Sequence, residues 1–322
     1  MRSITEPRPA RRSRGAARHD PRSTMRSATE PAVSPVRVAA VQSDPQVGLE
    51  NKEKNVAATL QRIEEAADAG ARLIVLPELA NTGYGFDTRE EAYAHAEAVP
   101  DGPTCAAWSE LARRRDLYVV AGITEVEGVH LYDTAVLIGP DGYIGRYRKT
   151  HLWNREKLIF TPGDGFPVFE TRIGRIGLLV CWDIWFPEVP RILAAQGADV
   201  ICSANNWVWT PPPLFDDAGN CMASYLTMAA SHVSGVPIVA ADRVGTERGG
   251  KFLGCSLITG VNGWPIGGIA SAEDETTLYA DLDLTETRSA VVWSDLNDLP
   301  RDRRTDLYDP LLGFTGGTVL PR

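Results

Sequence analysis

Cysteine and long apolar runs are both scarce in this sequence. Only five of its 322 residues are Cys, and none of them forms a C-x-x-C pair. This argues against a disulfide framework and a structural zinc site, and it fits a reducing compartment. No apolar run reaches the roughly 18 residues that a membrane-spanning helix requires, and the N-terminus lacks the apolar stretch of a secretory signal. We therefore expect a soluble, cytoplasmic protein without a membrane partner.

Basic residues are also in the minority. The chain has 33 Lys and Arg against 42 Asp and Glu, which gives a formal net charge of -9. Binding to a phosphate backbone needs clustered Lys and Arg, so nucleic acid is not an expected partner.

Residues 1–34 depart from this composition because they are dense in Arg, Pro, Ser and Ala. Such a segment cannot bury enough apolar surface to offset the entropy lost on ordering, so we predict a disordered basic tail. A basic arm that binds an acidic partner is the less favoured interpretation, since charge runs are usually solvated. Met25 is a second candidate for the start of the protein.

From Val36 onward, short apolar runs alternate with segments of helical periodicity. The runs VRVAAVQ and ARLIVLPEL are predicted strands on either side of a helix, and a second strand–helix alternation follows RIGLLV. Turn signals at Pro140-Asp141-Gly142 and at Asn262-Gly263 predict one hairpin in each half.

The two halves therefore resemble each other. We predict an α/β fold in which two mixed sheets pack face to face with helices outside them, a four-layer α-β-β-α sandwich. Periodicity alone leaves a single doubly wound sheet open. No linker-like stretch interrupts residues 36–300, so residues 35–322 are assigned to one catalytic domain with a C-terminal extension from Leu299.

Cys181 lies between the apolar run RIGLLV and a predicted helix. Its sulfur would project from the carboxyl end of a sheet near a helix N-terminus, where thiolate is favoured and a thiol pKa falls from about 8.5 toward 7. The competing interpretation is an inert buried cysteine, which is the better one for any single Cys. That interpretation is kept for Cys105, Cys202, Cys221 and Cys255.

Glu78 and Lys149 also follow apolar runs. Glu78 closes LIVLP beside expected buried surface, where desolvation raises the pKa of a carboxyl toward the range of a general base. An exposed loop carboxylate is an equally weighted alternative. Lys149 ends YIGRYRK, and taken alone it would be a solvated strand-end lysine.

The segments PELANTGY, YRKTHLW and CWDIWFPE occur in this order, each after an apolar run. Together they resemble the three signature segments of the nitrilase superfamily of carbon–nitrogen hydrolases. Further segments, EKLIFTPGD, ADRVG, FLGCSLI and DRRTDLY, extend the resemblance over residues 36–308. It implies the α-β-β-α sandwich, a Glu-Lys-Cys triad at Glu78, Lys149 and Cys181, and a second glutamate, Glu156, that positions substrate and the attacking groups.

The residue types imply a mechanism. Glu78 takes the thiol proton, the Cys181 thiolate attacks the electrophilic carbon, and Lys149 with the backbone N–H of Trp182 stabilises the oxyanion. Glu78 then protonates the departing ammonia and activates the water that hydrolyses the thioester. We expect neither a metal nor an organic cofactor, and His151 is expected to be a structural hydrogen-bond partner.

The segment SANNWVWTPPP resembles the loop that borders the pocket in this family. Asn206, Trp207 and Trp185 are therefore candidates for substrate selection, and aromatic groups there would favour an apolar or flat acyl group. Core packing or a dimer contact is about as good an interpretation of these tryptophans.

The pattern CWD-x-WFPE is closer to the amidase and carbamoyl-hydrolase branches than to true nitrilases. We therefore expect a small amide as substrate, hydrolysed to a carboxylic acid and ammonia. An N-carbamoyl amine or amino acid and a nitrile are the enzymatic alternatives. A pseudo-enzyme scaffold is disfavoured because all triad positions are occupied.

The resemblance also implies a homodimer or higher homo-oligomer, in which sandwiches pair across a helix face near the nucleophile helix. Two positions depart from the family pattern. Ser231-His232 replaces a Glu-Asn pair of many relatives, and Asp242 replaces an Asn. The departures leave the branch open without affecting the triad.

Overall fold

The computed structural model describes residues 35–208, 210–288 and 293–312. The predicted tail over residues 1–34 lies outside the described residues, and so does the end of the predicted C-terminal extension.

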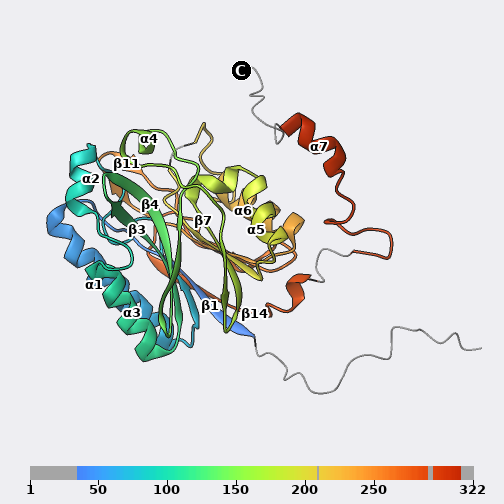
Figure 1. The fold of residues 1–322 in the computed structure, drawn as a ribbon, viewed down its shortest axis with the longest axis horizontal. Coiled ribbons are helices and arrows are strands. Elements are labelled where there is room, and N and C mark those ends of the chain that lie inside the picture. The colour runs from blue at the N-terminus through green and yellow to red at the C-terminus, as the bar shows by residue number, and fades with distance from the viewer. Residues whose placement is uncertain (1–34, 209, 289–292, 313–322) are drawn as a thin grey trace, which may run out of the picture. The chain divides into compact units, whose positions relative to one another are not determined.

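The first sheet has six strands and combines the first half of the chain with one strand from near its end (Figure 1). β1, β2 and β3 run parallel, and the remaining neighbours pair antiparallel. The hairpin predicted at Pro140-Asp141-Gly142 is confirmed, because Gly139 pairs with Gly142 at the turn. In spatial order the strands are β14 (Thr276–Leu282), β1 (Val36–Gln42), β2 (Leu73–Val75), β3 (Tyr118–Glu127), β4 (His130–Gly139) and β5 (Gly142–Arg148).

The second sheet also has six strands, all from the second half of the chain. Its central strands β7, β8 and β9 are parallel, and the hairpin predicted at Asn262-Gly263 joins the last two strands. A separate two-stranded hairpin is formed by β10 (Thr246–Glu247) and β11 (Gly250–Lys251). In spatial order the six strands are β13 (Pro265–Ile269), β12 (Leu257–Thr259), β9 (Ile238–Ala241), β8 (Val200–Ala204), β7 (Gly174–Val180) and β6 (Val168–Thr171).

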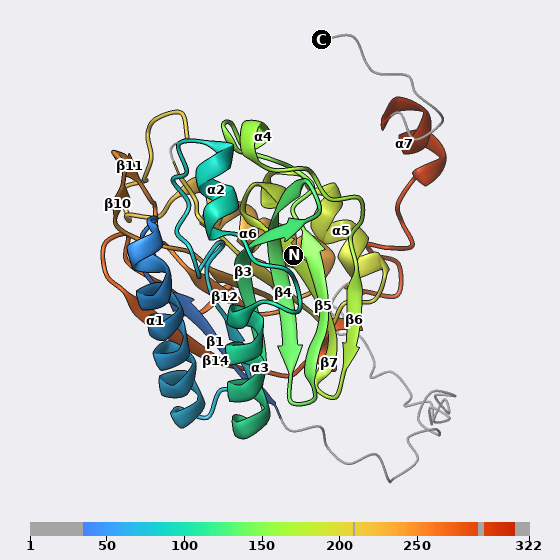
Figure 2. The ribbon, with the colours of Figure 1, turned by 60° about the vertical axis from the view of Figure 1, so that its left-hand side comes forward.

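Two longer helices lie outside each sheet (Figures 1 and 2). α1 (Leu49–Asp68) and α3 (Pro103–Arg115) bury apolar faces on the first sheet, where Trp108 is fully buried and its indole N–H donates to Thr59 at 2.9 Å. α5 (Glu188–Ala195) and α6 (Met222–Ser234) pack on the second sheet. None of the helices in the described part of the chain is long and apolar enough to span a membrane.

The core between the sheets is one continuous apolar cluster. It joins inward residues of the first sheet, such as Val38 and Val120, to residues of the second, such as Leu178 and Ile201, and all four are fully buried. The predicted four-layer α-β-β-α sandwich is therefore confirmed, and the single doubly wound sheet is excluded. The remaining described helices are α2 (Arg89–His95), α4 (Glu156–Ile159), α7 (Thr305–Leu312) and the 3₁₀ helices η1 (Cys181–Trp185) and η2 (Glu286–Arg288).

A buried ion pair network joins the two halves of the chain. The fully buried guanidinium of Arg243 donates to Asp44 at 2.6 Å and to Glu247 at 3.2 Å, and it lies 3.9 Å from the centre of the Phe252 ring. Glu247 also accepts three backbone N–H groups from the first half of the chain. Arg243 therefore neutralises a carboxylate that holds distant segments together.

We predict that Arg243→Met lowers the free energy of unfolding by about 3–5 kcal/mol, because it leaves the Glu247 charge buried and unpaired. Arg72→Met is the matched control: Arg72 pairs with Asp116 at 2.6 Å, but both side chains are about half exposed. Its cost should be no more than about 1 kcal/mol. Urea unfolding followed by circular dichroism measures both, and equal losses would contradict the assigned role of Arg243.

Candidate active site

The candidate triad residues come from the ends of three strands. Glu78 lies three residues after β2, Lys149 directly follows β5, and Cys181 directly follows β7 in the second sheet. Glu156 is the first residue of α4. All four side chains are buried, so the exposed-carboxylate interpretation of Glu78 and the solvated-lysine interpretation of Lys149 are both wrong.

The ammonium group of Lys149 is the centre of the site. Its Nζ donates to Glu78 Oε1 at 2.5 Å and to Glu156 Oε1 at 2.8 Å. A third carboxyl, that of Asp133, lies 3.5 Å from Nζ. Burial would by itself lower the pKa of Lys149, but the surrounding negative charges, led by Glu156 and Glu78, hold it well above its ordinary value. The lysine is therefore a permanent cation.

Glu156 is held as an acceptor by three donors. Besides Lys149, the hydroxyl of Tyr84 donates to Oε1 at 2.6 Å and the backbone N–H of Trp153 donates to Oε2 at 2.8 Å. These bonds fix the carboxylate beside Lys149. Tyr84 lies within PELANTGY, the segment that contains Glu78, but the sequence analysis did not identify Tyr84 as a site residue.

Cys181 occupies a strained position. Its φ is +46°, in the left-handed region that costs a residue with a side chain of order 1–3 kcal/mol. Its backbone N–H donates to Asn205 Oδ1 at 3.2 Å. The chain thus turns sharply after β7, and the charges of Lys149 and Glu78 act on the thiol at this turn.

The expected lowering of the Cys181 pKa is wrong. Burial raises the pKa of this thiol well above its ordinary value, the charge of Glu78 raises it further, and Lys149 opposes both. The element after Cys181 is a 3₁₀ helix of only five residues, so little helix dipole acts on the sulfur. The resting thiol is therefore neutral and needs a base to remove its proton.

Glu78 is placed to be that base. Burial raises the pKa of its carboxyl above the ordinary value, and the charge of Lys149 opposes the rise. Lys149 occupies only Oε1, while Oε2 is buried and accepts no hydrogen bond from the described residues. A buried carboxylate with a raised pKa is suited to accept a proton.

Asp183 supports the turn that carries Cys181, and the sequence analysis missed it. Its Oδ2 accepts the backbone N–H of Val180 at 2.9 Å and the hydroxyl of Tyr147 at 2.7 Å, and its Oδ1 lies 2.8 Å from His151 Nδ1. His151 also stacks on Phe186, with ring centres 3.8 Å apart. Asp183 thus ties the end of β7 to the strand end that carries Lys149.

The candidate pocket residues divide into two groups. Trp182 and Trp185 are partly exposed and lie 4.7 Å apart by ring centres, and Trp153 lies 4.3 Å from Trp182. Trp182 is the second residue of η1, a position whose backbone N–H has no partner within a helix. Trp207 is only 1% exposed and belongs to the core between the sheets, which favours a packing role for it.

Asn206 lies at the site itself. Its side-chain amide donates to the backbone oxygen of Glu78 at 2.9 Å, and its Oδ1 is buried and lacks a hydrogen bond within the described structure. The residue thus fixes the backbone that carries the candidate base.

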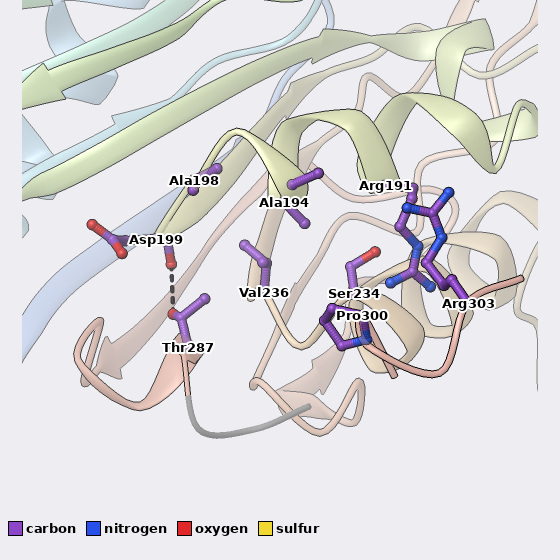
Figure 3. A pocket seen from close by; sticks show the side chains of 11 residues that line it. Arg191, Ala194, Ala198, Asp199, Ser234, Val236, Thr287, Pro300 and Arg303 are labelled. Carbon is purple, nitrogen blue, oxygen red and sulfur yellow. Dashed lines mark hydrogen bonds between the residues drawn. The ribbon is translucent and has the colours of Figure 1, made fainter. Parts of the chain in front are cut away.

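A cavity of about 230 Å³ beside α5 is separate from this site (Figure 3). It is bordered by Arg191, Ser234 and Arg303, and a hydrogen bond from Thr287 to the backbone oxygen of Asp199 closes one end. It contains none of the residues around Lys149, so we do not assign the chemistry to it.

Comparison with known proteins gives concordant matches. The family model described as carbon-nitrogen hydrolase matches residues 37–291. A nitrilase from Pyrococcus abyssi is 42% identical, over 85% of this chain and 99% of its own length. An N-carbamoylputrescine amidase from Solanum lycopersicum is 33% identical, over 81% of this chain and 91% of its own length. The crystal structure of a carbon-nitrogen hydrolase from Helicobacter pylori matches with a TM-score of 0.75 at 28% identity. The match covers 87% of this chain and 99% of that one.

We predict opposite shifts in the Cys181 pKa for two variants of the site. Glu78→Gln removes the charge that raises the thiol pKa and should lower it, whereas Lys149→Met removes the charge that lowers the pKa and should raise it further. Alkylation of Cys181 by iodoacetamide across neutral and alkaline pH, followed by mass spectrometry, reports these shifts.

The matched control is Cys202, a fully buried thiol whose pKa is raised by burial alone. Its alkylation should be equally slow in all three proteins, since neither variant changes a charge that acts on it. An identical pH dependence for Cys181 in the wild type and both variants would show that the charges do not act on this thiol.

Proposed function

Since this chain belongs to the carbon–nitrogen hydrolase family and is an amidase-type hydrolase, we propose that it hydrolyses a small linear amide through a thioester on Cys181. The observation that carries the proposal is the buried ammonium of Lys149, which binds Glu78 and Glu156 and whose charge, like that of Glu78, acts on the thiol of Cys181. A nucleophile, a base and a cation are thus within electrostatic reach of one another.

Acylation begins when the neutral thiol of Cys181 gives its proton to Glu78. As the proton leaves, the sulfur forms a bond to the carbonyl carbon, and the carbonyl electron pair moves to oxygen. Lys149 and the backbone N–H of Trp182 stabilise that oxyanion, an effect worth about 3–4 kcal/mol for one well-placed donor. Because the thiol pKa is raised, proton transfer and attack occur together and no standing thiolate is required.

Collapse of the oxyanion breaks the C–N bond and leaves a thioester. Glu78 returns its proton to the leaving nitrogen, so ammonia departs as a neutral molecule. Water then enters, Glu78 takes one of its protons, and the resulting attack releases the carboxylic acid and restores the thiol. The balance is one amide and one water consumed, and one acid and one ammonia formed.

A small amide with a flat or apolar acyl group is the substrate class that we favour. The support is the partly exposed cluster of Trp153, Trp182 and Trp185, which includes the residue next to Cys181. The name of the Solanum relative favours an N-carbamoyl amine as the second candidate, and that of the Pyrococcus relative favours a nitrile as the third.

We also infer a cytoplasmic location for the enzyme. All five cysteines are free and buried, as expected for a protein that folds under reducing conditions.

We predict that Cys181→Ala lowers ammonia release by at least about a thousand-fold without unfolding the protein, because no other group supplies the nucleophile. Cys202→Ala should retain substantial activity, since that thiol packs in the core. The assay is ammonia release from a panel of linear amides, N-carbamoyl compounds and nitriles. Activity of the Cys181 variant equal to that of the wild type would exclude the proposed mechanism, and the preferred panel member would identify the substrate class.

We further propose that the protein assembles as a homodimer or higher homo-oligomer across the face of α6. This helix covers the second sheet, yet Met222, Tyr225 and Val233 on it are exposed at 56%, 39% and 41%. Nearby, Trp264 is 68% exposed and lines a shallow cavity with residues of α6. Exposed large apolar side chains gathered on one face are typical of an interaction surface.

We predict that sedimentation at micromolar concentration gives a species heavier than the 35.0 kDa chain. Val233→Glu should shift the protein toward the monomer, because it places a charge in the apolar contact. Leu49→Glu, at a residue of α1 that is 58% exposed, should leave the mass unchanged. A wild-type protein that sediments only as the single chain would refute the proposed assembly.

A further inference from the structure

Asp133 is a buried carboxyl that the mechanism above does not use. It lies within β4, its side chain is fully inaccessible, and its backbone oxygen accepts the N–H of Lys149 at 2.8 Å. One oxygen from each of the carboxyls of Asp133, Glu78 and Glu156 lies within 4.8 Å of the others. Three acids thus surround the single ammonium of Lys149.

The charges of this cluster do not balance if every acid is ionised. Three carboxylates and one ammonium would leave two uncompensated negative charges among buried side chains. The other titratable groups that face it, Tyr84 and Cys181, are neutral because burial holds the pKa of each well above its ordinary value. A buried group without a counter-charge takes up a proton instead. At least one of the three carboxyls is therefore protonated.

The hydrogen-bond donors identify which carboxyl holds the proton. Glu156 accepts three hydrogen bonds, and Glu78 accepts a short one from Lys149. Asp133 has only the 3.5 Å contact with Lys149, and both its oxygens are buried without a hydrogen bond from the described residues. Since hydrogen bonds to a carboxylate favour its charged form, Asp133 is the least stabilised of the three anions.

We propose that Asp133 is a permanently protonated carboxylic acid that donates a hydrogen bond to Glu78 and so positions the catalytic base. Two ionised carboxylates in contact would repel each other, whereas an acid and a carboxylate share one proton. The same proton gives the otherwise unpartnered Asp133 a partner. That Glu78 is the base rests on the proposed function, but the protonation of Asp133 does not.

The electrostatics of both groups agree with this assignment. Burial, followed by the charge of Glu78, holds the pKa of Asp133 well above its ordinary value. In return, the hydrogen bond from Asp133 opposes the rise that burial causes in the pKa of Glu78. Asp133 thus keeps Glu78 ionised without adding a negative charge that would compete for Lys149.

Two substitutions of Asp133 distinguish a neutral carboxylic acid from a carboxylate anion at this position. Asp133→Asn keeps the shape, the neutral charge and a donor, so kcat should change by no more than about three-fold and the acidic limb of the pH–rate profile should not move. Asp133→Ala removes the donor, so the pKa of Glu78 should rise. The acidic limb should then move to higher pH, and kcat should fall about ten- to a hundred-fold, the range of one hydrogen bond to a charged group.

Infrared difference spectroscopy tests the proton directly and does not depend on activity. In the Cys181→Ala background at neutral pH, the difference between the spectra without and with Asp133→Asn should contain the carbonyl band of a protonated carboxylic acid. The buried carboxyl of Asp242, whose pKa is also raised well above its ordinary value, contributes to both spectra and cancels in the difference. Glu156→Gln is the matched control and should retain the band, because three hydrogen bonds favour the charged form of Glu156 against the rise in pKa that burial causes. If Asp133→Asn does not fold, Asp133→Ala replaces it in the same comparison.

The proposal is supported if the band is lost with the Asp133 variants alone. A difference spectrum without such a band at neutral pH would overturn it, and so would a band lost with Glu156→Gln but kept with Asp133→Asn. These spectroscopic outcomes do not depend on whether the protein hydrolyses amides. A folded Asp133→Asn variant whose acidic limb moves by about one pH unit or more would also overturn it, because that shift requires an ionised aspartate in the wild type.

Discussion

The buried ammonium of Lys149 is the constraint on which the site depends. Glu78, Asp133 and Glu156 come from different parts of the first half of the chain, and each would be costly to bury beside the others without a cation. The lysine is equally costly to bury without them. Charge balance thus links the first sheet to α4, and the same positive charge is available to an oxyanion that forms during the reaction.

The second sheet contributes the proposed nucleophile, and its thiol is neutral rather than a preformed thiolate. Its sharp turn holds Cys181 at positive φ, and Asp183 ties that turn to the strand end that carries Lys149. The thiol pKa is raised because the sulfur is buried beside Glu78. A neutral thiol needs its base at the moment of attack, so the positions of Glu78 and Cys181 matter together, and a change in either sheet would affect both.

Much of this arrangement could be predicted from sequence, because signature segments after apolar runs identified Glu78, Lys149, Glu156 and Cys181 together with the sandwich. The predictions that failed depend on contacts between residues that are far apart in the sequence. The Cys181 pKa was predicted with the wrong sign because local sequence shows a helix start, but neither the burial of the sulfur nor the Glu78 charge from another sheet. Within the segment LYDTAVLIG, no sequence feature distinguishes Asp133 from an ordinary polar residue, and only the fold places it beside Lys149. Likewise, periodicity cannot show that β14 pairs with β1, Val36 opposite Leu282.

The central claim is that the reaction passes through an acyl group bound to Cys181. Rapid acid quenching of the wild-type enzyme during turnover of a slowly deacylated amide, followed by mass spectrometry of the peptide that contains Cys181, tests it directly. The account predicts that this peptide gains the mass of the acyl group and that hydroxylamine removes it. Ammonia release with no acyl group on Cys181, or with the acyl group on another side chain, would contradict the account.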